Sequence, residues 1–209
     1  MKRICISQRV ESVASYGERR DCLDQRWFEL IFRLGYVPVP LPNVSEEHAR
    51  QLLADLQPHA VILSGGNSIA SLDPSASDVA PERDAFESAV VAHAVDTGTP
   101  VIGVCRGMQV LNLYFGGELL EIEGHVATRH PLRPCSDAYS LPIEVNSYHQ
   151  YCIPATGLST AFTPLGFDED GNIEAFCHKE KRILGIMWHP EREKPYSQLD
   201  FELMKRFVA

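Results

Sequence analysis

The chain has 209 residues, of which 44% are hydrophobic and 22% charged, and this composition predicts a single globular domain over residues 1–209. Its formal net charge of −9 argues against non-specific binding to nucleic acid or to an anionic membrane. The net charge does not exclude binding of a small anionic ligand, because a local arginine cluster can override the overall charge.

The N-terminal segment and the cysteines indicate the compartment. Residues 1–7 lack the apolar region of a signal peptide, and no apolar run approaches the length of a transmembrane helix. The six cysteines are scattered and form no C-x-x-C pair, so we expect reduced thiols rather than a disulfide framework. These features predict a cytoplasmic protein.

The first half of the chain alternates between strand-like and helix-like segments around a polar stretch at 8–20. Short apolar runs predict strands at residues 3–7, 36–41, 60–63 and 101–104. Apolar residues at helical spacing, together with caps and glycine stops, predict helices at 21–34, 45–56, 81–97 and from 108 to the glycine pair at 116–117. This order predicts a right-handed parallel sheet with helices on both faces, which binds ligands beyond the carboxyl ends of its strands.

The second half is less regular. Residues 118–144 are expected to form irregular strands or hairpins, and further strands are expected at 143–146, 173–178 and 182–188, with a turn at 168–172. A final helix, N-capped by Ser197, is expected to run to the end of the chain.

Two glycine-containing segments fall at the carboxyl ends of predicted strands. Residues 64–68 read Ser-Gly-Gly-Asn-Ser, where the glycines allow backbone N–H groups to face a ligand; an ordinary turn is the alternative. Residues 103–107 read Gly-Val-Cys-Arg-Gly, the spacing of a nucleophile elbow with cysteine as the nucleophile. Both segments are expected at the same edge of the sheet.

Cys105 is therefore the candidate nucleophile. The flanking glycines let neighbouring backbone approach closely on both sides of the thiol. At a helix N-terminus the unpaired N–H groups and the macrodipole favour a thiolate, and a nearby imidazolium can bring the thiol pKa below about 7. A buried structural cysteine is the alternative.

A cysteine nucleophile needs a base and a group that orients the base. His189 ends an apolar strand, and Glu191 follows two residues later, with Pro190 fixing the turn between them. A carboxylate at this spacing can hold one ring nitrogen and leave the other facing the thiol; a surface histidine beside a carboxylate is the alternative. The remaining histidines, cysteines and aspartates show no metal-ligand spacing, so we expect no metal.

In this order, residues 64–67 (Ser-Gly-Gly-Asn), 103–109 (Gly-Val-Cys-Arg-Gly-Met-Gln) and 188–191 (Trp-His-Pro-Glu) resemble the class I glutamine amidotransferase superfamily. The resemblance spans essentially the whole chain. It implies an α/β fold of the flavodoxin-like kind: an open, mostly parallel sheet with helices on both faces and a small antiparallel flap. It also implies a catalytic triad of Cys105, His189 and Glu191.

Shorter segments are similar to narrower groups. Residues 83–84, 105–107, 116–117 and 145–149 look like the stand-alone γ-glutamyl hydrolases, such as the γ-glutamyl-GABA hydrolase group. Residues 6–9, 63–67, 174–176, 178–179, 185–189 and 191–193 look like the bacterial hydrolases of cytidine-diphosphoramidyl-glutamine, which serve phosphoramidate decoration of surface polysaccharide in capsule biosynthesis. This second likeness implies hydrolysis of N5-(cytidine 5'-diphosphoramidyl)-L-glutamine to cytidine diphosphoramidate and glutamate through a thioester.

The resemblance also implies roles for further residues. Backbone N–H groups of Gly66 and Arg106 are expected to form the oxyanion hole. Expected to bind the substrate are Asn67, Gln109 and the backbone around Asn146, Ser147, Tyr148 and His149. His149 is as well explained as a core histidine. An anionic leaving group would need cations, and the candidates are Arg9, Arg19, Arg20, Arg83 and Arg192, with Arg9 favoured because it follows the first strand.

The expected partner is a small-molecule γ-glutamyl substrate, with neither nucleic acid nor membrane. No cofactor is expected, and a homodimer is one option for the assembly. Two rival functions remain open at this stage. One is a glutaminase subunit that passes ammonia to a synthase, which predicts weak activity alone. The other is a non-enzymatic binding protein, which predicts an unreactive Cys105.

Overall fold

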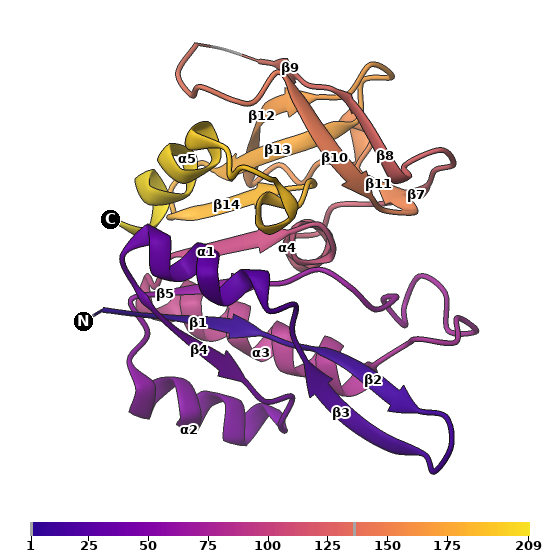
Figure 1. Cartoon of the computed structure of the whole chain (residues 1–209), viewed down its shortest axis with the longest axis vertical. Helices are drawn as coiled ribbons and strands as arrows, with labels where there is room; N and C mark the ends of the chain where they lie inside the picture. Colours follow the sequence, from indigo (N-terminus) through magenta and orange to yellow (C-terminus); the bar gives the residue numbers. More distant parts are fainter. Residues whose placement is uncertain (1, 136) are drawn as a thin grey trace.

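A mixed eight-stranded sheet forms the centre of the computed structural model, which describes residues 2–135 and 137–209 (Figure 1). The strand order is β4-β1-β5-β6-β14-β13-β12-β9. The first five strands pair in parallel, and the last three are added antiparallel. Their bounds are β1 Arg3–Ser7, β4 Val37–Leu41, β5 Ala60–Leu63, β6 Val101–Val104, β14 Ile183–Ile186, β13 Ile173–His178, β12 Phe162–Phe167 and β9 Arg133–Pro134.

The parallel part has the topology that the sequence predicts. Numbered along the chain, its five strands lie in the order 2-1-3-4-5, which is the flavodoxin-like arrangement. Strand β1 therefore lies inside the sheet, between β4 and β5. The expected α/β fold with a mostly parallel sheet is confirmed.

Helices cover both faces of the sheet because its strands are apolar on both sides. Ile4 and Ile6 face a cluster that includes α1 and α5, whereas Cys5 between them faces a cluster with α2, α3 and α4. The helices are α1 Arg26–Leu34, α2 Glu46–Leu56, α3 Pro81–Thr97, α4 Arg106–Tyr114 and α5 Gln198–Val208. Short 3-10 turns lie at Ala155–Gly157 (η1) and Pro190–Arg192 (η2).

Smaller antiparallel pairs complete the fold. Two of them lie near the antiparallel end of the main sheet, and together with the loops that join them they form the expected flap (Figure 1). They are β8 Val126–Pro131 with β10 Glu144–Tyr148, and β7 Leu120–Glu121 with β11 Tyr151–Cys152.

The polar segment after β1 differs from expectation. It forms a hairpin of β2 Arg9–Val13 and β3 Glu18–Cys22, which extends away from the sheet (Figure 1). All five residues of β3 are exposed or half-buried, so this ribbon lacks the apolar alternation that identifies a strand in a sequence. The helix predicted to begin at residue 21 begins instead at Arg26, after the hairpin ends, and the side chain of Asp24 accepts a hydrogen bond from the Arg26 N–H at 3.0 Å.

Across the described residues, no helix has both the length and the apolar character required to cross a bilayer.

Candidate active site

Cys105 lies at the apex of a sharp turn from β6 into α4. Its backbone adopts φ 51° and ψ −108°, a conformation that costs energy for a residue with a Cβ atom. Its N–H donates to the Ile186 carbonyl at 2.8 Å, and its carbonyl accepts from the Gln109 N–H at 3.1 Å. These two hydrogen bonds, one to the sheet and one to the first turn of the helix, hold Cys105 in its strained conformation.

The two elbow glycines are required by close backbone contacts. A Cβ atom at Gly107 would lie 2.1 Å from the Leu63 carbonyl oxygen, and one at Gly103 would lie 2.5 Å from the Gly107 carbonyl oxygen. No side chain fits at either position without moving backbone. The glycine spacing thus follows from the packing of α4 against β5 and β6.

His189 reaches the same edge of the sheet from β14. Its Nδ1 lies 2.7 Å from Oε1 of Glu191, and both side chains are almost completely buried. A glycine at position 65 makes room for the ring, because a Cβ there would lie 2.7 Å from His189 Cε1 and 3.5 Å from its Nε2. The same Cβ would lie 3.5 Å from the Cys105 Cβ, so the imidazole and the thiol share one small space.

Charge couples the thiol to the imidazole. Burial raises the pKa of Cys105, but the charge and hydrogen bond of His189, aided by His149 and the Arg106 N–H, outweigh burial and lower it. Burial lowers the pKa of His189, but the charges of Glu191 and Cys105 outweigh burial and raise it to about 9. Both shifts favour the thiolate–imidazolium pair over the neutral thiol and imidazole.

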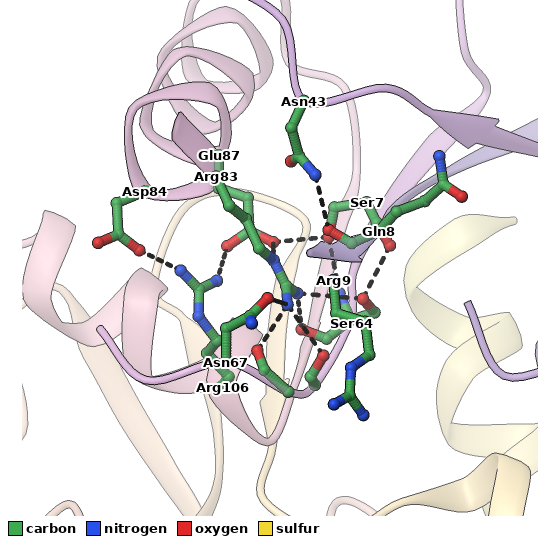
Figure 2. A network of polar contacts seen from close by, with 12 residues as sticks. Ser7, Gln8, Arg9, Asn43, Ser64, Asn67, Arg83, Asp84, Glu87 and Arg106 are labelled. Carbon is green, nitrogen blue, oxygen red and sulfur yellow. Dashed lines mark hydrogen bonds and ion pairs between the residues drawn. The ribbon is translucent and has the colours of Figure 1, made fainter. Parts of the chain in front are cut away.

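A buried ion network holds the glycine loop that follows β5 (Figure 2). Arg83, fully buried, donates to three successive carbonyls: Ser64 at 2.7 Å, Gly65 at 3.2 Å and Gly66 at 2.5 Å. In a trans peptide the N–H points opposite to the C=O. With the Gly65 carbonyl turned to Arg83, the Gly66 N–H therefore points away from the network.

The network is closed by carboxylates from α3. Glu87 accepts from Arg83 at 2.9 Å, from the Ser7 hydroxyl at 2.6 Å and from Arg106, whose guanidinium also bonds Asp84 (Figure 2). These two carboxylates hold the Arg106 guanidinium, while the Arg106 backbone N–H, in the first turn of α4, is directed at the Cys105 thiol.

Two cavities flank this centre. One, of about 300 Å³, is lined by Cys105, Gly66, Gln109 and by residues 148–151 of the flap. The other, of about 340 Å³, is lined by His189, Gly66 and Arg9, with Trp27 and Arg192 among its further walls. Gly66 lines both cavities, so a molecule that reaches both would contact the thiol in the first and the imidazole in the second.

Several residues expected to bind substrate have other tasks. Asn146 accepts from the His189 N–H at 3.0 Å and donates to the His189 carbonyl at 2.9 Å and to Glu193 at 2.6 Å, so its amide holds the imidazole's backbone. The Ser147 hydroxyl is buried and donates to the His125 carbonyl at 2.7 Å. Asn67 lines the smaller cavity, but its amide exchanges hydrogen bonds with the Val10 backbone at 2.8 and 2.9 Å.

Three other predicted residues do face the smaller cavity. Gln109 donates to the Tyr151 carbonyl at 2.9 Å, and His149 lies 3.0 Å from the same carbonyl through Nδ1. The ring of Tyr148 stands edge-on to His189 at 5.6 Å and carries the Arg192 guanidinium on its face at 4.2 Å.

Of the five candidate arginines, only Arg9 and Arg192 line the larger cavity. Arg83 was wrongly included, because it is fully buried among its partners in the network. Arg19 and Arg20 lie on the hairpin and pair with Glu82 and Glu18, outside the lining of the cavity.

A histidine cluster beside the site was not found from the sequence. His125, His130, His149 and Glu174 each offer one ligand atom, and these atoms lie within 4.8 Å of one another. The four residues come from the flap and from β13 and have no regular spacing along the chain. Only the pairing of β8 with β10, and the position of both over β13, brings them together.

Comparisons with known proteins identify the family. The Peptidase C26 family profile matches residues 4–191. The chain is 32% identical to a γ-glutamyl-CDP-amidate hydrolase of Campylobacter jejuni, over 99% of this chain and 97% of that protein. It is 31% identical to a carbamoyl phosphate synthase small chain of Maridesulfovibrio salexigens, over 81% of this chain and 39% of that protein.

A comparison with solved structures gives the same fold. The structure of a candidate GMP synthase component from Thermoplasma acidophilum superposes with a TM-score of 0.71 at 20% identity, covering 100% of this chain and 92% of that one. At this identity the likeness concerns the fold alone. The family profile covers most of the chain, and the first relative aligns over nearly its full length. The chain therefore belongs to the Peptidase C26 family, of the class I glutamine amidotransferase-like proteins.

Proposed function

We propose that the chain is a cysteine-dependent hydrolase that cleaves the γ-glutamyl amide bond of a glutamine-derived small molecule and releases glutamate. The observation that carries the proposal is Cys105 on a strained elbow between two cavities, with the buried His189–Glu191 pair beside it. The family and the Campylobacter jejuni relative support hydrolysis of a C–N amide bond.

The residues supply each step of this reaction. The Cys105 thiolate adds to the γ-carbonyl carbon, and the backbone N–H groups of Gly66 and Arg106 stabilise the oxyanion, each by roughly 3 kcal/mol. Protonated His189 gives its proton to the leaving nitrogen as the C–N bond breaks, which leaves a γ-glutamyl thioester. Neutral His189, oriented by Glu191, then takes a proton from the water that attacks the thioester, and glutamate leaves.

The two cavities suggest how the substrate is divided. Cys105 lines the smaller cavity, so the acyl half belongs there, beside Gln109 and His149. His189 lines the larger cavity, so the nitrogen that it protonates, with the rest of the leaving group, belongs on that side. Arg9 and Arg192 at this cavity suit a phosphate-bearing leaving group, since guanidinium groups bind phosphate through paired hydrogen bonds.

The specific substrate that we propose is N5-(cytidine 5'-diphosphoramidyl)-L-glutamine, hydrolysed to cytidine diphosphoramidate and glutamate for capsule biosynthesis in the cytoplasm. Its support is the name of the relative at 32% identity and the two arginines of the larger cavity. A γ-glutamyl-GABA-type hydrolase is the alternative. A glutaminase subunit is a further one, since a carbamoyl phosphate synthase small chain is among the relatives.

A panel of γ-glutamyl amides, including the cytidine compound, γ-glutamyl-GABA and glutamine, tests the proposal through released glutamate. We expect the isolated protein to turn over the panel, with the highest kcat/KM for the cytidine compound, and Cys105→Ala to be inactive while keeping its fold by circular dichroism. Activity in Cys105→Ala contradicts the mechanism. Hydrolysis of glutamine alone, and only with a synthase present, would favour the glutaminase subunit.

A further inference from the structure

We propose that His125, His130, His149 and Glu174 form a binding site for a divalent transition-metal ion, with Zn²⁺ as the best fit. The cluster joins three elements: His125 precedes β8, His130 lies in β8, His149 follows β10, and Glu174 lies in β13 of the main sheet. One ligand atom from each lies within 4.8 Å of the others.

Several ligand atoms of the cluster are buried and make no hydrogen bond within the described part of the chain. The side chains of His149 and Glu174 are each 1% exposed. Both Glu174 carboxylate oxygens and the Nε2 atoms of His130 and His149 make no hydrogen bond. Burial of a carboxylate that makes no hydrogen bond is unfavourable, and a cation held between its oxygens and the two nearby imidazoles would remove that cost.

The hydrogen bonds on the outer side of two rings set their tautomers. His149 Nδ1 lies 3.0 Å from the Tyr151 carbonyl, and His130 Nδ1 lies 3.1 Å from the Pro131 carbonyl. A carbonyl only accepts, so each Nδ1 carries a proton and each Nε2 of a neutral ring presents a lone pair to the cluster. Metal-binding histidines use this arrangement, in which the outer N–H is fixed by an oxygen.

The distances inside the cluster suit a metal better than they suit protons. Nε2 of His149 lies 3.5 Å from one Glu174 oxygen, and Nε2 of His130 lies 3.7 Å from the other. Charge-assisted N–H···O bonds are usually about 2.7–2.9 Å long. Ligands about 2.0–2.1 Å from a tetrahedral Zn²⁺ are about 3.4 Å apart, close to these two separations, and the four ligand atoms as a set lie within 4.8 Å.

The charges and the ligand types of the cluster also favour a metal ion. The His125 ring packs at 5.1 Å from the His130 ring and at 4.9 Å from the His149 ring, and three adjacent imidazolium ions would repel one another around one carboxylate. Three neutral imidazoles with one carboxylate are a familiar donor set for Zn²⁺.

The ion would tie the flap to the main sheet. It would link β8 and the end of β10 to β13, and through His149 it would hold residues 148–151, which line the smaller cavity. Cys105 is not in the cluster, so this site is distinct from the thiolate and does not depend on the proposed function.

Metal content and affinity test the site without measuring activity. Protein stripped with a chelator is titrated with Zn²⁺ in wild type, Glu174→Gln and His130→Ala, with His93→Ala on α3 as the matched control. We expect one equivalent bound in wild type and in His93→Ala, and at least a tenfold loss of affinity in the other two. Equal binding in all four proteins, or no binding to wild type at micromolar Zn²⁺, overturns the proposal.

X-ray absorption on the loaded wild type keeps the test valid if a variant fails to fold. We expect a first shell of nitrogen and oxygen only, at about 2.0–2.1 Å, with imidazole scattering behind it. A sulfur at about 2.3 Å would place the ion on a cysteine and overturn the proposal. The Cys105→Ser variant separates these cases again, because it should bind one equivalent as wild type does.

Discussion

Replacing Asn146 by alanine would test whether this side chain positions His189 or binds substrate. Its amide makes two hydrogen bonds to the backbone of His189, at 3.0 and 2.9 Å, and a third to Glu193 at 2.6 Å. The residue is buried, so the groups that it leaves behind would have no ready contact with water. The variant therefore removes support from the imidazole without touching its ring.

The magnitude follows from these contacts. An unpaired buried backbone group costs about 1–3 kcal/mol, so two of them on His189 would destabilise the fold by about 2–6 kcal/mol. If the His189 backbone shifts to find new hydrogen-bond partners, the imidazole ring shifts with it. A displacement of about 1 Å can cost about 100-fold in rate. We expect kcat to fall by roughly 10- to 100-fold, with KM nearly unchanged, because the lost interaction acts in the chemical step.

The assay is steady-state release of glutamate, with unfolding followed by urea titration. Asn112→Ala is the matched control: Asn112 is also buried and makes three hydrogen bonds, to Glu118, Gly157 and Ser159. It should lose comparable stability and keep its kcat. A rise in KM with kcat intact in Asn146→Ala would make Asn146 a substrate contact, and an equal fall of kcat in Asn112→Ala would trace the effect to stability.

Three further predictions concern the site. Glu191→Gln should reduce kcat less than His189→Ala does, because the imidazole can still exchange protons; equal losses would mean that Glu191 does more than orient the ring. Activity should decline as pH rises through about 9, where His189 loses its proton, and this limb should move to lower pH in Glu191→Gln because the carboxylate raises the His189 pKa; an unmoved limb in the pH–rate profile would assign it to another group. Arg9→Ala should raise KM for the cytidine substrate far more than for a simple γ-glutamyl amide, whereas Arg20→Ala should change neither; parallel rises in Arg9→Ala would remove Arg9 from the leaving-group site.

Local features of the chain were predictable because their causes are local. The elbow was visible in residues 103–107, since an apolar strand, two glycines and a helical pattern are all adjacent in sequence. The contact between His189 and Glu191 was predictable for the same reason, as one short turn joins them. Helix α3 has the predicted bounds, because Pro81 and the glycine after Thr97 mark both ends.

Features that depend on partners far along the chain were not predictable. Arg83 was a candidate cation for an anionic leaving group, but it bonds Ser64 and Glu87, and Glu87 in turn bonds Ser7, so its place follows from the pairing of β1 with β5. The Asn146 side chain acquires its role only where the flap meets the end of β14. The histidine cluster needs both the flap and β13, so no spacing rule along the sequence could identify it.

The buried ion network fixes the geometry of the glycine loop, whereas other groups set the protonation of Cys105. Arg83 and Arg106 are balanced by Glu87 and Asp84, so four charges cancel within one cluster. The Cys105 pKa is lowered instead by His189, by His149 and by the Arg106 N–H, all outside that balance. A charge-balanced network can fix the carbonyls of the glycine loop without setting the protonation of the nucleophile. Removal of one of these four charged side chains would leave an unpaired buried charge, which costs about 3–5 kcal/mol in stability. That charge would also change the pKa of Cys105, so the network would no longer act on the glycine loop alone.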